Sequence, residues 1–409
     1  MVMCRGAISV VLCASVLACG EADSRWAGTM LDSAGVTIVS NTDVAVWTTG
    51  EEWTLEEDLR IGAPEGDPDY LFGAIVGIAV DSRERIFVLD GQAQHVQVYS
   101  PEGMYEQTVG SPGEGPGEIQ RAAALLMGPG DTLLVPDPGN MRFNRYATDG
   151  TSAGGLRIDA LAGVPIAFRT TPSGLLAERI RLRVEGVPTR EDAIVLLGTD
   201  GSVADTLWTF PSAEFPNRAS YQIYAPRQSW DIMGDTVLLM GDSEQYRIGL
   251  YSGRQLDRII VKPFEQRMVS VRDKGTVNNA LRTRYLSEGA SSEMIERVLQ
   301  RFDYSGPFPA FEAFVAGPNN TIWVQHQRAV SELSDEELAT FDPRRDFAAP
   351  EWDIFDSAGR FLGVVTLPER FEPAVFRAEK VYGVWYDEQD LSYVVRLRGV
   401  GDLGERRVP

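Results

Sequence analysis

Few side chains in this sequence could perform acid–base or metal chemistry. Among 409 residues there are two histidines, His95 and His326, and all three cysteines fall within the first 19 residues. A zinc site of three histidines is therefore excluded, and a Ser-His-Asp triad would need one of these two, in a sequence without a G-x-S-x-G elbow. We predict that His95 is a half-buried, hydrogen-bonded residue of an alternating strand. His326 and the nearby Trp323 are candidates for a ligand-binding face.

Carboxylate and amide side chains form a second group of candidates, because calcium prefers oxygen ligands. They lie at the ends of predicted strands or in turns: Asp81, Asp90, Asp137, Asn140, Asp242 and Asn319. Aspartate and asparagine are also the residues that turns require, so both interpretations stay open. We therefore assign no metal site and predict no cofactor, with calcium as the ion that would bind if several of these residues converge.

One phrase of the sequence recurs, and this repeat predicts the fold. Residues 76–110 and 123–150 each contain an apolar strand, a polar turn, two further strands and a closing turn with glycine. Fainter copies follow at 196–210, 229–261, 311–327 continued by 352–367, and 374–399. A period of about 40 to 50 residues is typical of a four-stranded propeller blade. The sequence thus predicts an all-β fold, a six-bladed β-propeller of four-stranded antiparallel blades, in which the strand at 53–62 completes the last blade beside 393–397.

The stretch GSPGEGPGEI, residues 110–119, is predicted to connect two blades. It has four glycines and two prolines in ten positions. Glycine permits positive φ and proline fixes φ without donating to a strand ladder, which suits a sharp change of direction. A similar stretch at 62–68 precedes the first full unit.

This connector resembles the GxGPGEF-like connectors of NHL-type six-bladed β-propellers, especially those of bacterial secreted proteins and lipoproteins. The matching residues are Gly113, Gly115, Pro116, Gly117, Glu118 and Ile119, followed by a V-x-D-x-G-N-x-R pattern at Val135, Asp137, Gly139, Asn140 and Arg142. The first unit departs from the pattern, with Gln94 and His95 in place of Asn and Arg. The resemblance implies the fold, since the members share no single activity. We take Asn140 and Arg142 as further candidates for the ligand face.

Two functions are compatible with such a propeller. We predict a binding scaffold for a protein, peptide or glycan, at one face or at the mouth of the central channel. The alternative is a hydrolase or lyase similar to calcium-dependent lactonases and esterases, a resemblance that implies a metal held in the channel by Asp, Glu and Asn from several blades. Inward-facing carboxylates from three or more blades would favour the enzyme. An apolar or arginine-lined channel would favour binding.

A helical insertion is predicted at about 264–303. In SSEMIERVLQRF the apolar residues fall at helical spacing behind a serine N-cap. The insertion could cover one face, contact a partner or pack over a blade edge. An acidic segment follows at 331–353, where we expect a solvated loop with a short helix at 335–339.

The first residues predict export. Residues 1–18 have one arginine and a short apolar run, as in a signal peptide, and Val16-Leu17-Ala18-Cys19 resembles a bacterial lipobox, which implies that Cys19 carries lipid. Residues 19–50 are then predicted to be a tether and a segment that leads up to the propeller. The propeller itself is predicted at 51–402. We expect a lipid-anchored protein of the bacterial cell envelope, on the outer membrane if the host has two membranes, since Gly20 follows the cysteine. A formal charge of −21 disfavours nucleic acid as a partner.

The lipid anchor can be tested by replacing Cys19 with serine. We expect Cys19→Ser to abolish labelling of the protein by a radioactive fatty acid and to move it from the membrane fraction to the soluble fraction. Unchanged labelling would contradict the lipoprotein prediction.

Overall fold

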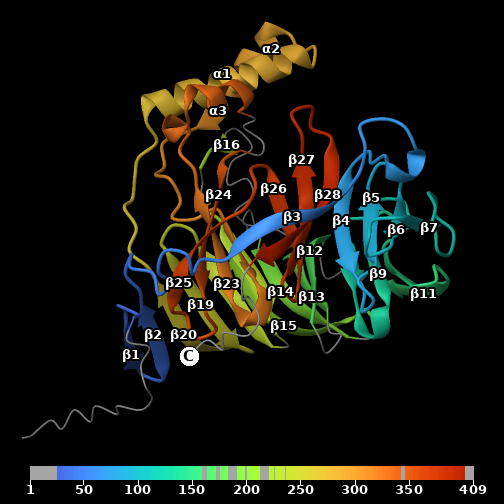
Figure 1. Cartoon of the computed structure of the whole chain (residues 1–409), viewed down its shortest axis with the longest axis horizontal. Coiled ribbons are helices and arrows are strands. Elements are labelled where there is room, and N and C mark those ends of the chain that lie inside the picture. Colours follow the sequence, from blue (N-terminus) through green and yellow to red (C-terminus); the bar gives the residue numbers. More distant parts are fainter. Residues whose placement is uncertain are drawn as a thin grey trace, which may run out of the picture.

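The strands form six blades around a central axis in the computed structural model (Figure 1). The structure describes residues 25–158, 164–171, 176–182, 191–198, 200–211, 221–224, 226–234, 236–341 and 346–400. Within these residues, each blade has four antiparallel strands, and one blade is extended by a hairpin. The predicted fold class, a six-bladed β-propeller with a helical insertion, is confirmed.

Blades I to III follow the chain from their innermost strand outward. Blade I contains β4 (Ile75–Val80), β5 (Ile86–Asp90), β6 (His95–Tyr99) and β7 (Tyr105–Val109). Blade II contains β8 (Leu126–Met127), β9 (Leu133–Asp137), β10 (Arg142–Tyr146) and β11 (Ser152–Arg157). Blade III contains β12 (Val164–Thr170), β13 (Leu176–Leu182), β14 (Glu191–Leu197) and β15 (Val203–Pro211). The strands β12 and β13 lie where the repeat was too faint to predict them.

Blades IV to VI continue the ring, and segments from the N-terminal part of the chain join them. Blade IV contains β17 (Gln228–Met233), β18 (Val237–Asp242), β19 (Arg247–Ser252) and β20 (Gln255–Val261). Blade V contains β22 (Ala313–Ala316), β23 (Ile322–Gln327), β24 (Ala348–Phe355) and β25 (Phe361–Thr366). Blade VI contains β26 (Phe371–Arg377), β27 (Lys380–Tyr386), β28 (Ser392–Val400) and, as its outermost strand, β3 (Thr54–Ile61).

The position of a strand in its blade explains its sequence pattern. The second strand β5, IFVLD, is buried at every residue, because neighbouring blades cover both faces of the sheet there. The outermost strand β7, YEQTV, alternates between exposed and half-buried residues until Val109, because it lies at the rim. Continuous apolar runs therefore mark the inner part of each blade, and alternation marks its edge.

The pairing of β3 with β28 joins the two ends of the propeller. Val394 pairs with Ile61 and Val400 with Thr54 in an antiparallel register, as predicted from the sequence. On the adjoining seam, Lys380 of β27 donates to Glu84 in blade I at 2.8 Å, and Tyr382 packs in one buried cluster with apolar residues of both blades. Because the outer strand of blade VI comes from the start of the chain, the propeller is complete only when both ends have folded together.

The N-terminal segment forms a belt, residues 36–61, along the outer edges of three consecutive blades. A hairpin of β1 (Thr29–Ser33) and β2 (Val36–Ser40) turns at Ala34-Gly35, where both φ angles are positive. β2 then pairs in parallel with β20 of blade IV. The amide of Trp47 donates to the carbonyl of Leu362 in blade V, and β3 pairs with blade VI. The segment predicted as a tether at 19–50 thus contains part of this belt.

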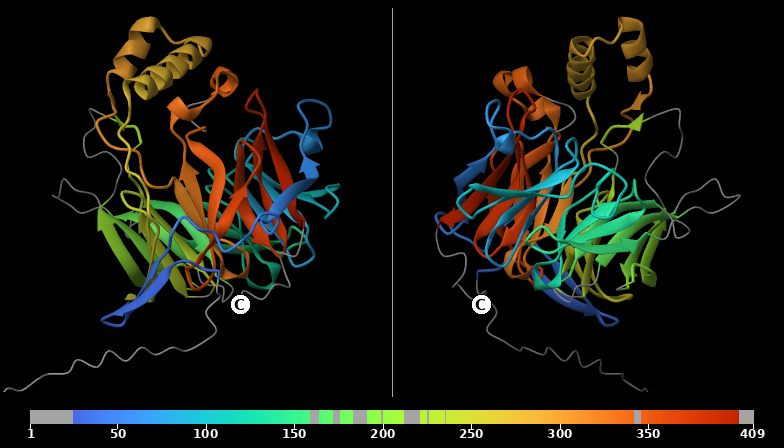
Figure 2. Two further views of the ribbon diagram at one scale, coloured as in Figure 1. Left: turned by 60° about the vertical axis from the view of Figure 1, so that its left-hand side comes forward. Right: turned by 90° about the vertical axis from the view of Figure 1, so that its right-hand side faces the viewer.

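The helical insertion stands over one end of the ring, and the β1–β2 hairpin projects beyond the other (Figures 1 and 2). The helical insertion contains α1 (Val271–Ser287) and α2 (Ser292–Leu299), both inside the segment predicted at about 264–303. Their N-caps are Ser270 and Ser291. The short parallel pair of β16 (Tyr221–Gln222) and β21 (Phe302–Asp303) lies at the base of the insertion. A third helix, α3 (Asp335–Thr340), forms in the acidic segment where a short helix was expected.

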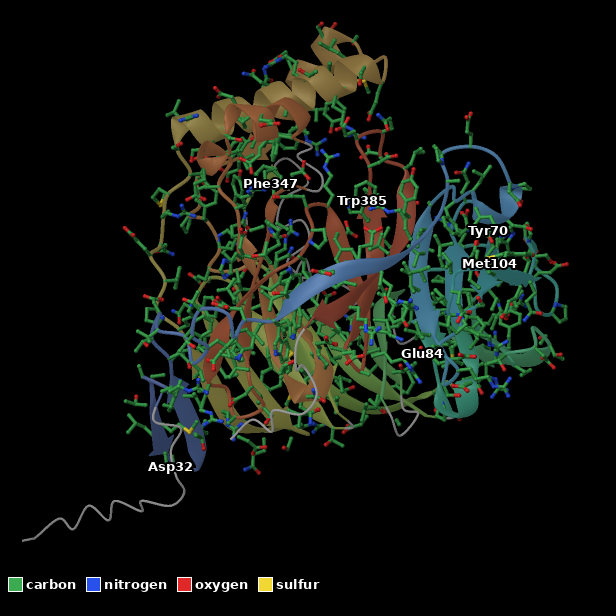
Figure 3. All side chains as sticks on the ribbon, in the orientation of Figure 1. Asp32, Tyr70, Glu84, Met104, Phe347 and Trp385 are labelled. Atoms are coloured by element: carbon green, nitrogen blue, oxygen red, sulfur yellow. The ribbon has the colours of Figure 1, made fainter. Side chains whose placement is uncertain are left out.

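The three helices share a small hydrophobic core of their own. Its buried residues come from α1, from α2, from the chain after β16 and after β21, and from the chain that follows β23: Tyr224, Val277, Leu281, Ile295, Leu299, Phe308, Ala329, Val330, Leu333 and Phe341. Phe347 packs against this cluster from below the helices (Figure 3). The expectation that the acidic segment is simply solvated is therefore wrong, since Leu333 and Phe341 anchor it beneath the insertion. No helix within the described residues is long and apolar enough to cross a membrane.

The glycine-rich connector is a compact loop that seats one apolar residue between blades I and II. The amide of Gly113 donates to the carbonyl of Ile119, and the amide of Ile119 donates to Ser111. Gly113 has φ +151°, and a Cβ there would lie 2.0 Å from a carboxylate oxygen of Glu118. That carboxylate accepts the amide of Gly115. The loop thereby holds Ile119 fully buried, a burial that stabilises the fold by about 2 to 3 kcal/mol.

Replacing Gly113 with alanine should destabilise this loop. We expect the free energy of unfolding in urea to fall by about 1 to 3 kcal/mol, because Glu118 must move away and the backbone stays in a region unfavourable for alanine. Gly275→Ala is the matched control. A Cβ on Gly275, in the exposed middle of α1, meets no atom within 4 Å, so this variant should be more stable by about 0.5 to 1 kcal/mol. Equal effects at both positions would contradict the assigned role of Gly113.

Candidate functional site

The central channel of the propeller is hollow and is a candidate site for a ligand. Its cavity of about 550 Å³ is lined by the innermost strands of all six blades, β4, β8, β12, β17, β22 and β26, and by the turns beside them. Its walls are mainly apolar, with Val76, Met127, Phe168, Val315 and Phe376 among the lining residues. A volume of this size is typical of sites for small molecules or short peptide segments.

One ion pair supplies the charge in the channel. Nε of Arg169, on β12, donates to Oδ1 of Asp231, on β17, at 2.7 Å. Oδ2 of Asp231 accepts the amide of Ala316, on β22, at 2.8 Å. A single buried carboxylate therefore joins the inner strands of blades III, IV and V.

Arg169 keeps part of its hydrogen-bonding capacity. Its Nη1 donates to the carbonyl of Phe168, and its guanidinium carbon lies 5.6 Å from the centre of the Trp230 ring. Its Nη2 has no hydrogen bond to a described residue, and the side chain is 42% exposed. Arg169 is thus a half-exposed cation at an otherwise apolar wall, where it can donate to an acceptor group of a ligand.

The carboxylates predicted as calcium candidates cap turns and do not converge. Asp81 accepts the amides of Arg83 and Arg85 and the Nε of Arg85. Asp242 accepts the amide of Glu244, and Asn319 sits in a turn at positive φ.

Asp90 and Asp137 occupy equivalent places in blades I and II, each holding the connector that precedes its blade. Asp90 accepts the amides of Gly73 and Ala74, and Asp137 accepts the amides of Gln120 and Arg121. Within the described residues, no three His, Cys, Asp or Glu side chains are placed to share an ion. The described residues therefore do not assemble a carboxylate site for calcium.

Asn140 and Arg142 hold the connector between blades I and II. Nδ2 of Asn140 donates to the carbonyl of Gly113 at 2.9 Å. The guanidinium of Arg142 donates to the carbonyls of Glu114, Gly115 and Glu118. The N-x-R pattern thus reflects the capture of backbone carbonyls from the glycine-rich loop, although both side chains also line an outer pocket of blade II.

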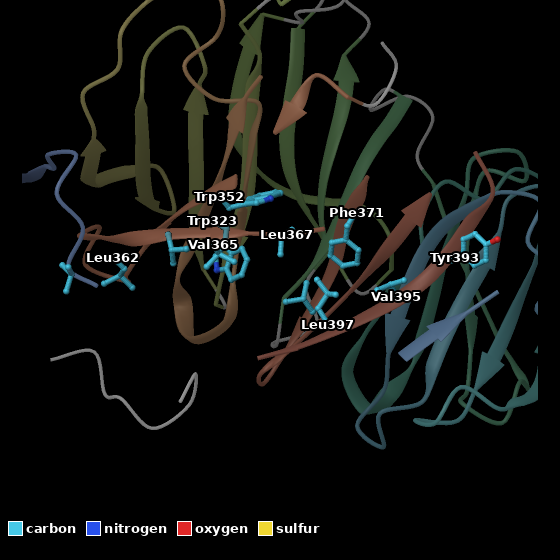
Figure 4. Close-up of a cluster of buried hydrophobic side chains, with 12 residues drawn as sticks. Trp323, Trp352, Leu362, Val365, Leu367, Phe371, Tyr393, Val395 and Leu397 are labelled. Atoms are coloured by element: carbon cyan, nitrogen blue, oxygen red, sulfur yellow. The ribbon is translucent and has the colours of Figure 1, made fainter. Parts of the chain in front are cut away.

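Trp323 is a core residue and not part of a ligand face. Its side chain is 1% exposed in the buried cluster between blades V and VI (Figure 4). Trp53 of the belt and Phe376 lie beside its ring, with centroids 6.1 and 5.1 Å away. The sequence pattern could not separate a large aromatic residue of the core from one that binds a ligand.

His326 belongs to a polar cluster between blades IV and V. Its Nε2 lies 2.9 Å from Oδ1 of Asp353, on β24, which is fully buried. Oδ2 of the same carboxylate accepts Nζ of Lys262 at 2.9 Å and the hydroxyl of Tyr246 at 2.5 Å. Asp43 lies 3.9 Å from Lys262 on the solvent side. The cluster connects four segments of the chain around one carboxylate.

The surroundings keep Asp353 ionised. Burial by itself would raise the pKa of Asp353, but hydrogen bonds from His326 and Tyr246 and the charges of His326 and Lys262 lower it below the ordinary value. Burial, followed by the neighbouring carboxylate, raises the pKa of Tyr246 well above its usual range. Tyr246 therefore stays a neutral hydrogen-bond donor.

His95 has a simpler environment. It begins β6 and is half-buried, opposite Asp90 in the ladder. Its half-buried position was predicted, but its ring makes no hydrogen bond to a described residue. Neither histidine lines the central channel.

The sequence did not reveal Arg169 and Asp231, the two charged residues of the channel. They are 62 positions apart, and Arg169 lies in the blade whose repeat was faintest. The one available signal was the short run Phe168-Arg169-Thr170, in which a charge interrupts a strand of apolar residues.

Comparisons with known proteins agree with the fold. A scan against models of protein families and a search of curated proteins found no match. Among solved structures, the chain is similar to a Bacteroides fragilis protein named as exported, at 12% identity over 89% of this chain and 100% of that one, with a TM-score of 0.50. It is also similar to virginiamycin B lyase of Staphylococcus aureus, at 14% identity over 85% and 99% of the two chains (TM-score 0.41). A third is regucalcin of Agrobacterium tumefaciens, a calcium-binding protein, at 11% identity over 85% and 96% (TM-score 0.41). At 12% identity and a TM-score of 0.50, the first of these similarities shows a shared fold alone.

The polar cluster around Asp353 predicts a specific dependence of stability on pH. The lowered pKa of Asp353 contributes stability above the unfolded-state pKa of about 3.9, and this contribution is lost as the pH falls through the lower folded-state value. We expect Asp353→Asn to lower the free energy of unfolding by about 3 kcal/mol at neutral pH, because Lys262 loses its buried partner. The difference from the wild-type protein should shrink between about pH 5 and pH 2.

Urea unfolding at a series of pH values measures this difference. Asp43→Asn is the control, because Asp43 faces the same lysine from solvent and is 79% exposed. It should change stability little at any pH. A difference for Asp353→Asn that stays constant down to pH 2 would mean that the carboxylate is not held ionised by this cluster.

Proposed function

We propose that the protein is a lipid-anchored binding protein of a bacterial cell envelope, and that it holds a peptide segment in its central channel. The observation that carries the proposal is the composition of the channel wall. Apolar side chains from six blades surround the cavity, and Arg169 is the cation exposed among them. This is the pattern expected for recognition of a largely apolar ligand with one acceptor group.

Backbone groups of the channel favour a peptide over a purely apolar molecule. Each innermost strand pairs with one neighbour within the described residues, so its other edge faces the channel. Such an edge presents N–H and C=O groups that an extended chain can satisfy. Apolar side chains of the peptide would contact Val76, Phe168 and Phe376, and a terminal carboxylate would accept Nη2 of Arg169.

The alternative function, a calcium-dependent lactonase, esterase or lyase, is supported by the shared fold only. Fold does not determine activity among propellers. The lining residues include one carboxylate, Asp231, and its two oxygens already accept hydrogen bonds from Arg169, Ile232 and Ala316. Chelation separates the two functions, since removal of a calcium ion present at a hundred times its dissociation constant would cost about 2.7 kcal/mol of stability.

A tripeptide, N-acetyl-Leu-Ala-Leu, tests binding in the channel. The mature chain with Cys19→Ser is titrated with the fluorescent apolar anion anilinonaphthalene sulfonate, which the peptide then displaces. We expect saturable binding, with the free carboxylate form displacing the dye about tenfold better than the C-terminal amide. The double variant Arg169→Gln/Asp231→Asn, which leaves no buried unpaired charge, should remove this difference.

Val76→Trp tests the location without disturbing the ion pair. Val76 lines the channel and is 41% exposed, so a tryptophan there should fill the cavity and weaken both peptides. Arg254→Gln is the control for loss of one positive charge, because Arg254 lies in the turn between β19 and β20 of blade IV, where it pairs with Asp205 on β15 of blade III. Displacement that is unchanged in Val76→Trp would show that the peptide does not bind in the channel.

A further inference from the structure

A second pocket lies in blade II, apart from the central channel. It has a volume of about 420 Å³ and is formed by the glycine-rich connector on one side and by β10 and β11 on the other. It shares no lining residue with the channel. Its lining contains Arg142 and Arg157, with Asn140 and Asn144 beside them, and no acidic residue. This is unusual in a chain with a formal charge of −21.

The two arginines occupy directly opposed positions of the sheet. Arg142 of β10 pairs with Arg157 of β11, so both side chains project from the same face. Like charges at opposed positions destabilise a strand pair unless something compensates them. The side chain of Arg157 is exposed and makes no hydrogen bond or ion pair with a described residue, and the guanidinium of Arg142 donates to three neutral carbonyls.

Arg142 is also fixed in place with donors to spare. Its guanidinium has five N–H groups, of which three are used to hold the connector, and its Nε is buried without an acceptor. Arg142 is thus held rigidly at the pocket without an ion pair to a described residue, although Asp137 is its neighbour on β9, and Arg157 stands exposed beside it. A preorganised arginine next to an exposed one suits bidentate recognition of a carboxylate or phosphate.

Glycines keep the pocket open. Gly155 pairs with Asn144 across the strands, and a Cβ at Gly155 would lie 3.6 Å from Cδ of Arg142. A larger side chain at this position would therefore project into the space beside the guanidinium. Gly117 of the connector faces Ser152 of β11 in the same way, with a Cβ 3.1 Å from Ser152.

We propose that this pocket binds a small molecule or group that carries an oxyanion, a carboxylate or a phosphate, between Arg142 and Arg157. The site is independent of the channel and of the function proposed for it. Asp137 on β9 faces Arg142 alone, so the oxyanion would supply the second negative charge that the opposed arginines need.

Calorimetric titration of the mature chain with Cys19→Ser tests the site, with inorganic phosphate and succinate as the two probes. We expect one saturable site per chain for at least one probe at physiological salt. Tighter binding of phosphate would identify a phosphate site, and tighter binding of succinate a carboxylate site. Arg157→Gln should weaken binding by about tenfold or more, and the variant should fold because the side chain is exposed and makes no hydrogen bond or ion pair with a described residue.

Gly155→Leu is the second variant, since it fills the pocket and leaves both arginines in place. It should abolish binding as well. Arg254→Gln carries the same change in net charge at a distant blade and should bind like the wild-type protein. Absence of saturable binding for both probes, or equal weakening in Arg157→Gln and Arg254→Gln, would overturn the proposal, since the second result would indicate attraction by net charge alone.

Discussion

The propeller depends on the belt formed by residues 36–61. Radial blades have no covalent link where the last meets the first, so some strand must cross that seam. Here the crossing strand β3 pairs with β28, and the same segment first pairs with β20 of blade IV and then bonds to blade V. Three blades that are distant in sequence from the belt are therefore held at their outer edges by one continuous stretch of chain.

The polar side chains of the structure serve this assembly in a regular way. The carboxylates of Asp90 and Asp137 accept hydrogen bonds from backbone amides of the connectors. The guanidinium of Arg142 donates to backbone carbonyls of a connector. Asp81 and Asp356 each cap a turn together with an arginine four positions later. Buried carboxylates are costly without partners, so each one marks a place where backbone groups would otherwise be unsatisfied. Asp353 extends this pattern to side-chain partners from a neighbouring blade.

The sequence revealed the fold well where local signals were strong. Apolar runs and glycine turns predicted blades I and II, and the helical spacing and serine cap of SSEMIERVLQRF predicted α2, because these features depend on neighbours in the chain. The strands β12 and β13 escaped detection since their pattern is weak, and the parallel pairing of β2 with β20 has no local signature at all. The functional candidates fared differently. Asn140, Arg142 and Trp323 are residue types that serve equally in packing and in binding, and only their contacts decide between the two.

The belt also determines how the protein would bear a load applied at its N-terminus. Such a pull meets the ion pair of Arg25 with Glu51, then the β1–β2 hairpin and Asn41, whose side chain is buried and bonds to Val261 of blade IV and to Gly359 and Phe361 of blade V. The strand β3 lies further along the chain, behind these contacts. Tension on a tethered molecule would therefore be taken up by blades IV and V, and the seam between blades VI and I would stay unstrained.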